Sequence, residues 1–102
     1  MNNYAQQSTR WIGRYGLMRK AYLEEHQPEL LRELTRSGRL SQHLVEVDAA
    51  ARRRLEALMP ALARNAGTTE TLKARDQLAW VQLMNACKAQ AEEIIFDEII
   101  YT

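Results

Sequence analysis

The chain has 102 residues, of which 46% are hydrophobic and 26% charged, and its formal net charge is +1. These proportions are ordinary for a soluble globular chain and exclude a disordered one, and the length supports a single core. The one cysteine, Cys87, excludes an intramolecular disulfide, and no stretch approaches the roughly 18 uninterrupted apolar residues of a membrane span. We expect one cytoplasmic domain over residues 1–102, with residues 1–8 flexible.

Helix-forming residues dominate the composition. Ala, Leu, Glu, Arg and Gln are abundant, whereas the chain holds only four Gly and two Pro. The composition therefore predicts an all-α fold, a small helical bundle.

A first helix is predicted to begin after Ser8 or Thr9, either of which can cap it. Gly13 and Gly16 lie inside this helix, where each weakens it by about 1 kcal/mol relative to Ala. Glycine at such places indicates that another backbone comes close. The apolar stripe of the helix recurs at helical spacing and consists of Trp11, Tyr15, Met18 and Tyr22.

Two further helices are predicted on either side of Gly38, as an α-hairpin. Pro28 suits the first position of the second helix, and Gly38 is a good C-terminal cap. Ser41 caps the third helix, which Pro60 is expected to kink or break before Gly67 ends it. The third helix carries a nearly heptad seam of apolar residues: Leu44, Val47, Ala51, Leu55, Leu58 and Leu62.

One long C-terminal helix is predicted from Leu72 to Tyr101, capped by Thr68 or Thr69. Asp76 falls on its apolar face, where a carboxylate needs a partner. We interpret Asp76 as half of a buried ion pair with an arginine of the first or third helix. A catalytic carboxylate would need a second polar group in a cleft, and none is placed to supply it.

The last turns of this helix are apolar on almost every side. Such a helix needs burial on more than one side, and a chain of this length has little left to cover both. We therefore expect a homodimer or a partner protein to cover an interface made of Ile95, Phe96, Ile99, Ile100 and Tyr101. An alternative reading as a short strand lacks a second strand to pair with.

Charge is unevenly distributed along the chain. Residues 1–39 carry seven Lys or Arg against four Asp or Glu, and residues 65–102 carry three against six. The favoured interpretation is internal, with a basic N-terminal half lying on an acidic C-terminal helix. The other interpretation is a nucleic-acid footprint, which needs the basic residues gathered on one exposed face.

A helix-turn-helix comparison supplies candidate DNA contacts around Gly38. In this hypothesis Gln42, early in the third helix, reads a base edge. Any α-hairpin with a glycine turn makes the same pattern, and the run Arg52-Arg53-Arg54 fits a solvated face with one or two ion pairs. The phosphate contacts in the hypothesis are Arg10, Arg14, Arg19, Lys20, Arg36 and Arg39.

The sequence contains no recognisable catalytic set. It has no Gly-rich phosphate loop, nucleophile elbow or pair of catalytic carboxylates. His43 and Glu46 alone are a weak metal signal, and Cys87 fits an inert core residue because its helical neighbours are apolar. We expect no enzyme activity, no metal and no cofactor.

Three segments occur in an order and spacing that resemble a known family. They are IGRYGLMRKAYLEEHQPELLRELTRSGRLSQHLVEVDAAA, the run from Thr68 to Val81, and Met84-Asn85 followed by AEEII. Together they cover roughly residues 12–101 and resemble the TnpV family, small proteins encoded on bacterial transposons and other mobile elements. The resemblance implies an accessory, excisionase-like role and brings no catalytic residues with it.

Two functional hypotheses follow. In the first, the protein is an accessory protein of a mobile element that binds duplex DNA or the element's recombinase. In the second, it is a non-enzymatic protein–protein interaction module, a regulator or inhibitor without nucleic-acid contact. The surface charge distinguishes the two hypotheses, because basic residues that form ion pairs within the chain are not available to bind DNA.

Overall fold

The computed structural model describes residues 12–102, and every structural statement below concerns that part of the chain. Residues 12–102 contain no strand, so the all-α prediction is confirmed and the strand alternative is wrong. The predicted helix start at Ser8 or Thr9 and the predicted flexible residues 1–8 lie outside the described residues. The elements are α2 (Arg14–His26), α3 (Pro28–Arg36), α4 (Leu40–Ala66), α5 (Glu70–Arg75), α6 (Gln77–Ile95) and a π-helical turn, η1 (Phe96–Ile100).

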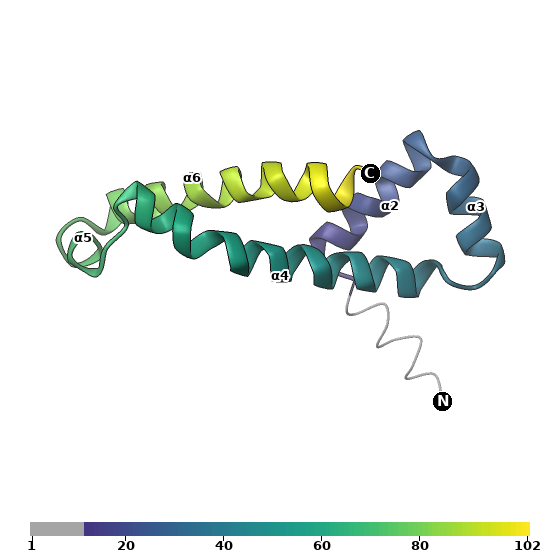
Figure 1. Ribbon diagram of the computed structural model, residues 1–102, viewed down its shortest axis with the longest axis horizontal. Helices are drawn as coiled ribbons and strands as arrows, with labels where there is room; N and C mark the ends of the chain where they lie inside the picture. Colours follow the sequence, from purple (N-terminus) through teal and green to yellow (C-terminus); the bar gives the residue numbers. More distant parts are fainter. Residues whose placement is uncertain (1–11) are drawn as a thin grey trace, which may run out of the picture.

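Two long helices set the shape of the molecule. α4 and α6 run side by side in opposite directions, and α5 connects them at one end (Figure 1). At the other end α2 packs on α4 and η1, and α3 leads from α2 into α4. The principal dimensions are 54 × 33 × 19 Å. One end is therefore a compact bundle, and the other is an extension of two helices.

Left-handed glycines end α3 and α4, as the sequence predicts. Gly38 has a φ of +74° and Gly67 a φ of +80°, in a region that L side chains rarely adopt. After Gly38 the Arg39 N–H donates to the Leu34 carbonyl oxygen at 2.9 Å, and an equivalent bond closes α4 after Gly67.

α4 differs from its prediction at two places. It begins at Leu40, one residue before the predicted cap Ser41, and no side chain caps it. It also continues through Pro60, so of the predicted kink or break, the break does not occur. The proline removes one backbone hydrogen bond, but tertiary contacts hold the helix on both sides of it. Leu58 packs against the core before the proline, and beyond it the Leu62 carbonyl oxygen lies 3.4 Å from Cys87 Sγ.

The core lies at the compact end, between α2, α4, α6 and η1. Tyr15, Ala51, Ile95 and Ile100 form its buried cluster. The predicted seam of α4 is confirmed, because its residues face this cluster or the neighbouring helices. The partly buried side chains around the cluster are Met18, Val47, Leu55, Leu58, Phe96 and Ile99.

The glycines of α2 allow it to approach α4 closely. A Cβ added at Gly16 would lie 2.8 Å from the backbone oxygen of Leu44, and one at Gly13 would lie 3.0 Å from the Asp48 carboxylate. Cβ atoms rarely tolerate such distances. The prediction that glycine marks a close backbone approach is therefore confirmed at Gly16. Gly13 is the N-cap of α2 rather than a residue inside it, and its close neighbour is a side chain.

The predicted continuous C-terminal helix is interrupted at Asp76. This residue has φ −149° and ψ 84°, and its Oδ1 accepts a hydrogen bond from the Ala79 N–H at 3.1 Å. Asp76 is an exposed N-cap of α6, so its assignment to a buried ion pair is wrong. The assignment assumed helical spacing through Asp76, whereas aspartate stabilises a helix start.

The C-terminal turns are core rather than an exposed interface. Ile95 and Ile100 are fully buried, and Phe96 and Ile99 pack against the same cluster. Only Tyr101 of the predicted interface is a large exposed hydrophobic residue, at 42%. α2 and α4 both contact η1, so the chain itself covers this end on more than one side.

The other end of the molecule has no comparable cover. None of residues 52–86 is buried. Leu55 and Leu58 pack against the core cluster, but α2 and α3 do not extend along the rest of this part of α4 and α6 (Figure 1). We call residues 52–86 the arm. Its most exposed large side chains are Leu78, at 68%, and Val81, at 38%. The most exposed apolar side chain of the predicted long helix, Leu78, therefore lies in its first half, whereas Tyr101 is the exposed one in its second half.

Candidate interaction surface

Arg19 is a structural residue of the compact end. It is buried, and its Nη1 donates to the backbone oxygens of Ile100 at 2.9 Å and Thr102 at 3.0 Å. Its Nε donates to His43 Nε2 at 3.2 Å. A guanidinium enclosed in this way cannot contact phosphates, so the prediction of Arg19 as a DNA contact is wrong. It instead fastens α2 to the carbonyl end of η1, where positive charge is favourable.

His43 is held in its neutral form beside Arg19. Burial lowers the pKa of His43, and the positive charge of Arg19 lowers it further. Because Nε2 accepts the hydrogen bond from Arg19, the proton of the neutral imidazole belongs on Nδ1. The structure therefore gives His43 a packing role.

Arg14 is engaged in a three-residue contact between α2 and α6. Glu92 Oε2 accepts hydrogen bonds from Arg14 Nη1 at 2.5 Å and from the Tyr15 hydroxyl at 2.6 Å. Burial works to raise the pKa of Glu92, but the two hydrogen bonds and the Arg14 charge together lower it. Burial and the bond to Glu92 raise the pKa of Tyr15 to about 12. This contact supports the internal interpretation of the charge asymmetry.

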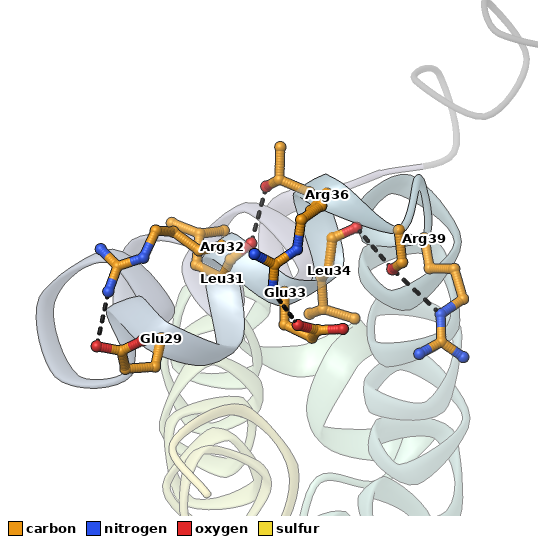
Figure 2. A network of polar contacts seen from close by, with 9 residues as sticks. Glu29, Leu31, Arg32, Glu33, Leu34, Arg36 and Arg39 are labelled. Carbon is orange, nitrogen blue, oxygen red and sulfur yellow. Dashed lines mark hydrogen bonds and ion pairs between the residues drawn. The ribbon is translucent and has the colours of Figure 1, made fainter.

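The candidate DNA contacts around Gly38 are also engaged within the chain. Figure 2 shows Arg36 paired with Glu33, one turn away on α3. Arg39 Nε donates to Ser37 Oγ at 3.3 Å. On α4, Gln42 Nε2 donates to Glu46 Oε2 at 3.0 Å, so the proposed base-reading amide has an acidic neighbour.

Two predicted contacts remain. Lys20 is exposed and has no ion-pair partner among residues 12–102, and Arg10 lies outside the described residues. The predicted contacts therefore do not form one free basic face within the part of the chain that the structure describes.

The arginine run on α4 makes the ion pairs expected of a solvated face. Arg54 forms a two-point contact with Glu98, with Nε–Oε1 2.9 Å and Nη2–Oε2 3.2 Å. Arg52 Nε donates to Asp48 Oδ2 at 2.9 Å. The Arg54 contact also joins α4 to η1, which again places basic residues on an acidic C-terminal helix.

Asp48 is the buried carboxylate that sequence reasoning missed. It is 1% exposed, and its Oδ1 accepts the backbone N–H of Gly16 at 2.9 Å. Two sequence signals could have found it. Asp48 lies in phase with the α4 seam, four residues after Leu44 and three before Ala51, and the α2 glycines indicate that a backbone approaches.

The arm carries the remaining candidate surface. From Gln77 to Cys87 α6 contains no charged residue, although 26% of the whole chain is charged. Lys73 precedes this stretch, with its Nζ 4.8 Å from the centre of the Trp80 ring. An exposed helix face without charge is unusual for a surface that meets only water.

Two other features were sought among residues 12–102, a metal site and a membrane-spanning helix. No group of three or more His, Cys, Asp or Glu side chains is placed to hold a metal ion. No helix there combines the length and apolarity needed to cross a bilayer. Cys87 is buried, which confirms its interpretation as a core residue.

Comparison with known proteins gives one result. The family model described as transposon-encoded protein TnpV matches residues 3–100. No curated protein and no solved structure is significantly similar to the chain. Because the match spans nearly the whole sequence, the chain belongs to the TnpV family of transposon-encoded proteins.

Proposed function

We propose that this protein is a non-enzymatic accessory protein of a bacterial mobile element and that it acts by binding the element's recombinase. An excisionase-like effect would then be exerted through the recombinase rather than by direct binding to duplex DNA. The arm is the surface proposed to make this contact.

The main support for the proposal is the position of the predicted DNA contacts in the structure. Arg19 is buried, Arg14 is paired with Glu92, and Arg36 is paired with Glu33. Nucleic-acid binding depends on basic groups that are free to displace counterions from phosphates. Arg19 is not free, and the carboxylates beside Arg14 and Arg36 oppose the approach of a phosphate.

The exposed apolar side chains on the α6 part of the arm support a protein partner. Leu78 and Val81 face solvent on a helix that is uncharged over three turns. Depletion of charge together with exposed apolar side chains is typical of protein interfaces. Family membership supplies the setting, since a transposon-encoded accessory protein has the recombinase of its own element as a partner within reach.

The proposal is tested by titrating the full chain into the labelled recombinase and, separately, into labelled duplex DNA of the element's ends at low salt. We expect saturable binding to the recombinase and only weak, non-specific binding to DNA. Leu78→Glu and Val81→Glu place a carboxylate on the exposed α6 face of the arm and should weaken recombinase binding. Ser41→Glu adds the same charge at the exposed start of α4 and should leave it unchanged.

Two outcomes would overturn the proposal. The first is no binding to the recombinase, whatever the DNA result. The second is tight, steeply salt-dependent DNA binding that Lys20→Ala with Arg39→Ala abolishes, combined with recombinase binding that none of the arm variants alters.

A further inference from the structure

Arg19 is a buried cation that no side-chain carboxylate neutralises. It is 6% exposed, and none of the ion pairs among residues 12–102 includes it. Its donors are bonded instead to the backbone oxygens of Ile100 and Thr102 and to the Nε2 of His43. A buried charge held in this way is sensitive to a second positive charge placed beside it.

His43 is the neighbour of Arg19 that can acquire such a charge. Its Nε2 accepts a hydrogen bond from Arg19 Nε at 3.2 Å, and it can do so only while this ring nitrogen carries no proton. Protonation would turn the acceptor into a donor that faces another donor, and it would place an imidazolium against the buried guanidinium. The contact between α2 and α4 at this point therefore requires the neutral ring.

The protonated ring has an alternative partner on its own helix. His43 lines a cavity of about 330 Å³ together with Leu34 of α3, Arg39 and Glu46. Glu46 follows His43 by three residues, which puts both side chains on one side of α4. Against the effects of burial and Arg19, the Glu46 carboxylate works to raise the pKa of His43. Arg39 lies at the opposite end of this group, before the first turn of α4.

We propose that His43 is an acid-sensitive switch for the C-terminal end of the chain. Its protonation breaks the contact with Arg19, turns the ring toward Glu46 and loosens the hold of Arg19 on η1. Two hydrogen bonds run from Arg19 to the end of this π-helical turn, at Ile100 and Thr102. A single π-helical turn is a rare geometry that depends on tertiary contacts. The proposal does not depend on the recombinase contact, because the arm contains neither residue of the switch.

The direction of the pH dependence follows from the position of His43 in the folded protein. Burial and the Arg19 charge lower its pKa from the ordinary value of 6.5, so the folded state binds this proton less tightly than the unfolded state does. The stabilisation that the neutral ring provides is therefore fully present above pH 6.5 and is lost as the pH falls through the lower, folded-state pKa. Acid, not alkali, should release η1.

A nuclear magnetic resonance titration of the full chain, from about pH 8 to about pH 5, tests the proposal. We expect the His43 ring signals to titrate with a midpoint below 6.5. The Arg19 Nε–H signal should be lost with the same midpoint, because its acceptor is removed. The backbone amide signals of Ile100 and Tyr101 should shift together with it, because they report the hold of Arg19 on η1.

Two histidine variants provide the matched comparison. His43→Gln keeps an oxygen that can accept the Arg19 N–H but cannot titrate, so it should abolish the acid shift of the Ile100 amide. His26 is the other histidine of the chain, and its ring lies 4.9 Å from that of Tyr22. His26→Gln should leave the acid shift of the Ile100 amide unchanged.

A variant at Glu46 tests the alternative partner and does not disturb the contact with Arg19. Glu46→Gln removes the carboxylate that favours the protonated ring and should move the His43 midpoint to lower pH. Far-ultraviolet circular dichroism identifies any variant that has lost its fold, and the titrations of the original chain and of Glu46→Gln still decide the matter if His43→Gln does not fold. An Ile100 signal that stays in place while His43 titrates, or that shifts equally in His43→Gln, would overturn the proposal. A His43 midpoint at or above 6.5 would also overturn it.

Discussion

At the scale of single residues, Asp48 joins α2 to α4. It is buried, and it accepts one hydrogen bond from the Gly16 N–H and one from Arg52. The first bond satisfies an amide in the first turn of α2, a helix whose own cap Gly13 offers no side chain. The carboxylate of Asp48, on α4, thus caps the N-terminus of α2.

Replacing Asp48 therefore tests how much this contact between α2 and α4 contributes to stability. We expect Asp48→Ala to lower the free energy of unfolding by about 2–3 kcal/mol, because it leaves a buried N–H and a guanidinium without their acceptor. Asp48→Asn keeps an oxygen for the Gly16 N–H and should cost about half as much. Asp76→Ala removes an exposed cap and should cost about 1 kcal/mol. Urea denaturation measures all three, and equal losses for Asp48→Ala and Asp76→Ala would contradict the assignment.

Tyr15 links the stability of the protein to alkaline pH. Its pKa is raised from 10.0 to about 12, so the folded state holds the phenol proton more tightly than the unfolded state does. The stabilisation is therefore fully present below pH 10.0 and is lost as the pH rises toward about 12. We expect the free energy of unfolding to fall by about 2 kcal/mol across this window.

Tyr15→Phe should flatten that fall, although the variant starts from a lower stability because it loses the hydrogen bond to Glu92. Tyr101→Phe, at an exposed tyrosine, should retain the fall. Urea titrations at a series of alkaline pH values give the comparison. A fall of the same size in Tyr15→Phe would show that another group is responsible.

At the scale of elements, the C-terminal helix was predicted to expose its last turns, whereas the structure buries those turns and exposes Leu78 near its start. Its apolar end is enclosed by α2 and α4, whereas Leu78, near its start, faces solvent. The break at Asp76 separates α5 from α6 and gives α6 its own capped start.

A pair of alanine substitutions tests this division. Ile100→Ala removes a fully buried side chain, and we expect it to lower the free energy of unfolding by about 2–5 kcal/mol. Leu78→Ala removes an exposed one and should change the free energy of unfolding by less than about 0.5 kcal/mol. Thermal or urea denaturation distinguishes the two. A larger loss for Leu78→Ala would mean that the arm is covered within the monomer.

At the scale of the whole molecule, a compact end built from α2, α3, η1 and parts of α4 and α6 supports an arm without a buried residue. The compact end engages Arg14, Arg54 and Arg19 through Glu92, Glu98 and the Ile100 carbonyl oxygen, respectively. Within the arm, the stretch of α6 from Gln77 to Cys87 carries no charge. The proposed function follows from this division, since an uncharged helix face suits a protein partner better than it suits phosphates.

The sequence by itself determined the features that depend on neighbours along the chain. Helix content, the left-handed turns at Gly38 and Gly67, and the apolar seam of α4 follow from local propensity, backbone sterics and helical periodicity. The family membership also follows from the sequence alone. The close approach marked by Gly16 was visible as well, but not the element that approaches.

Only the tertiary structure decided which groups are buried. Asp48 and Asp76 both lie in phase with an apolar face, and the difference between them is that α2 covers the first while the second begins a helix in solvent. Arg14 and Arg19 meet partners that lie 78 and 81 residues away in the chain. Whether a charge is free, or an apolar end exposed, depends on the element packed against it, and periodicity within one helix carries no information about that element.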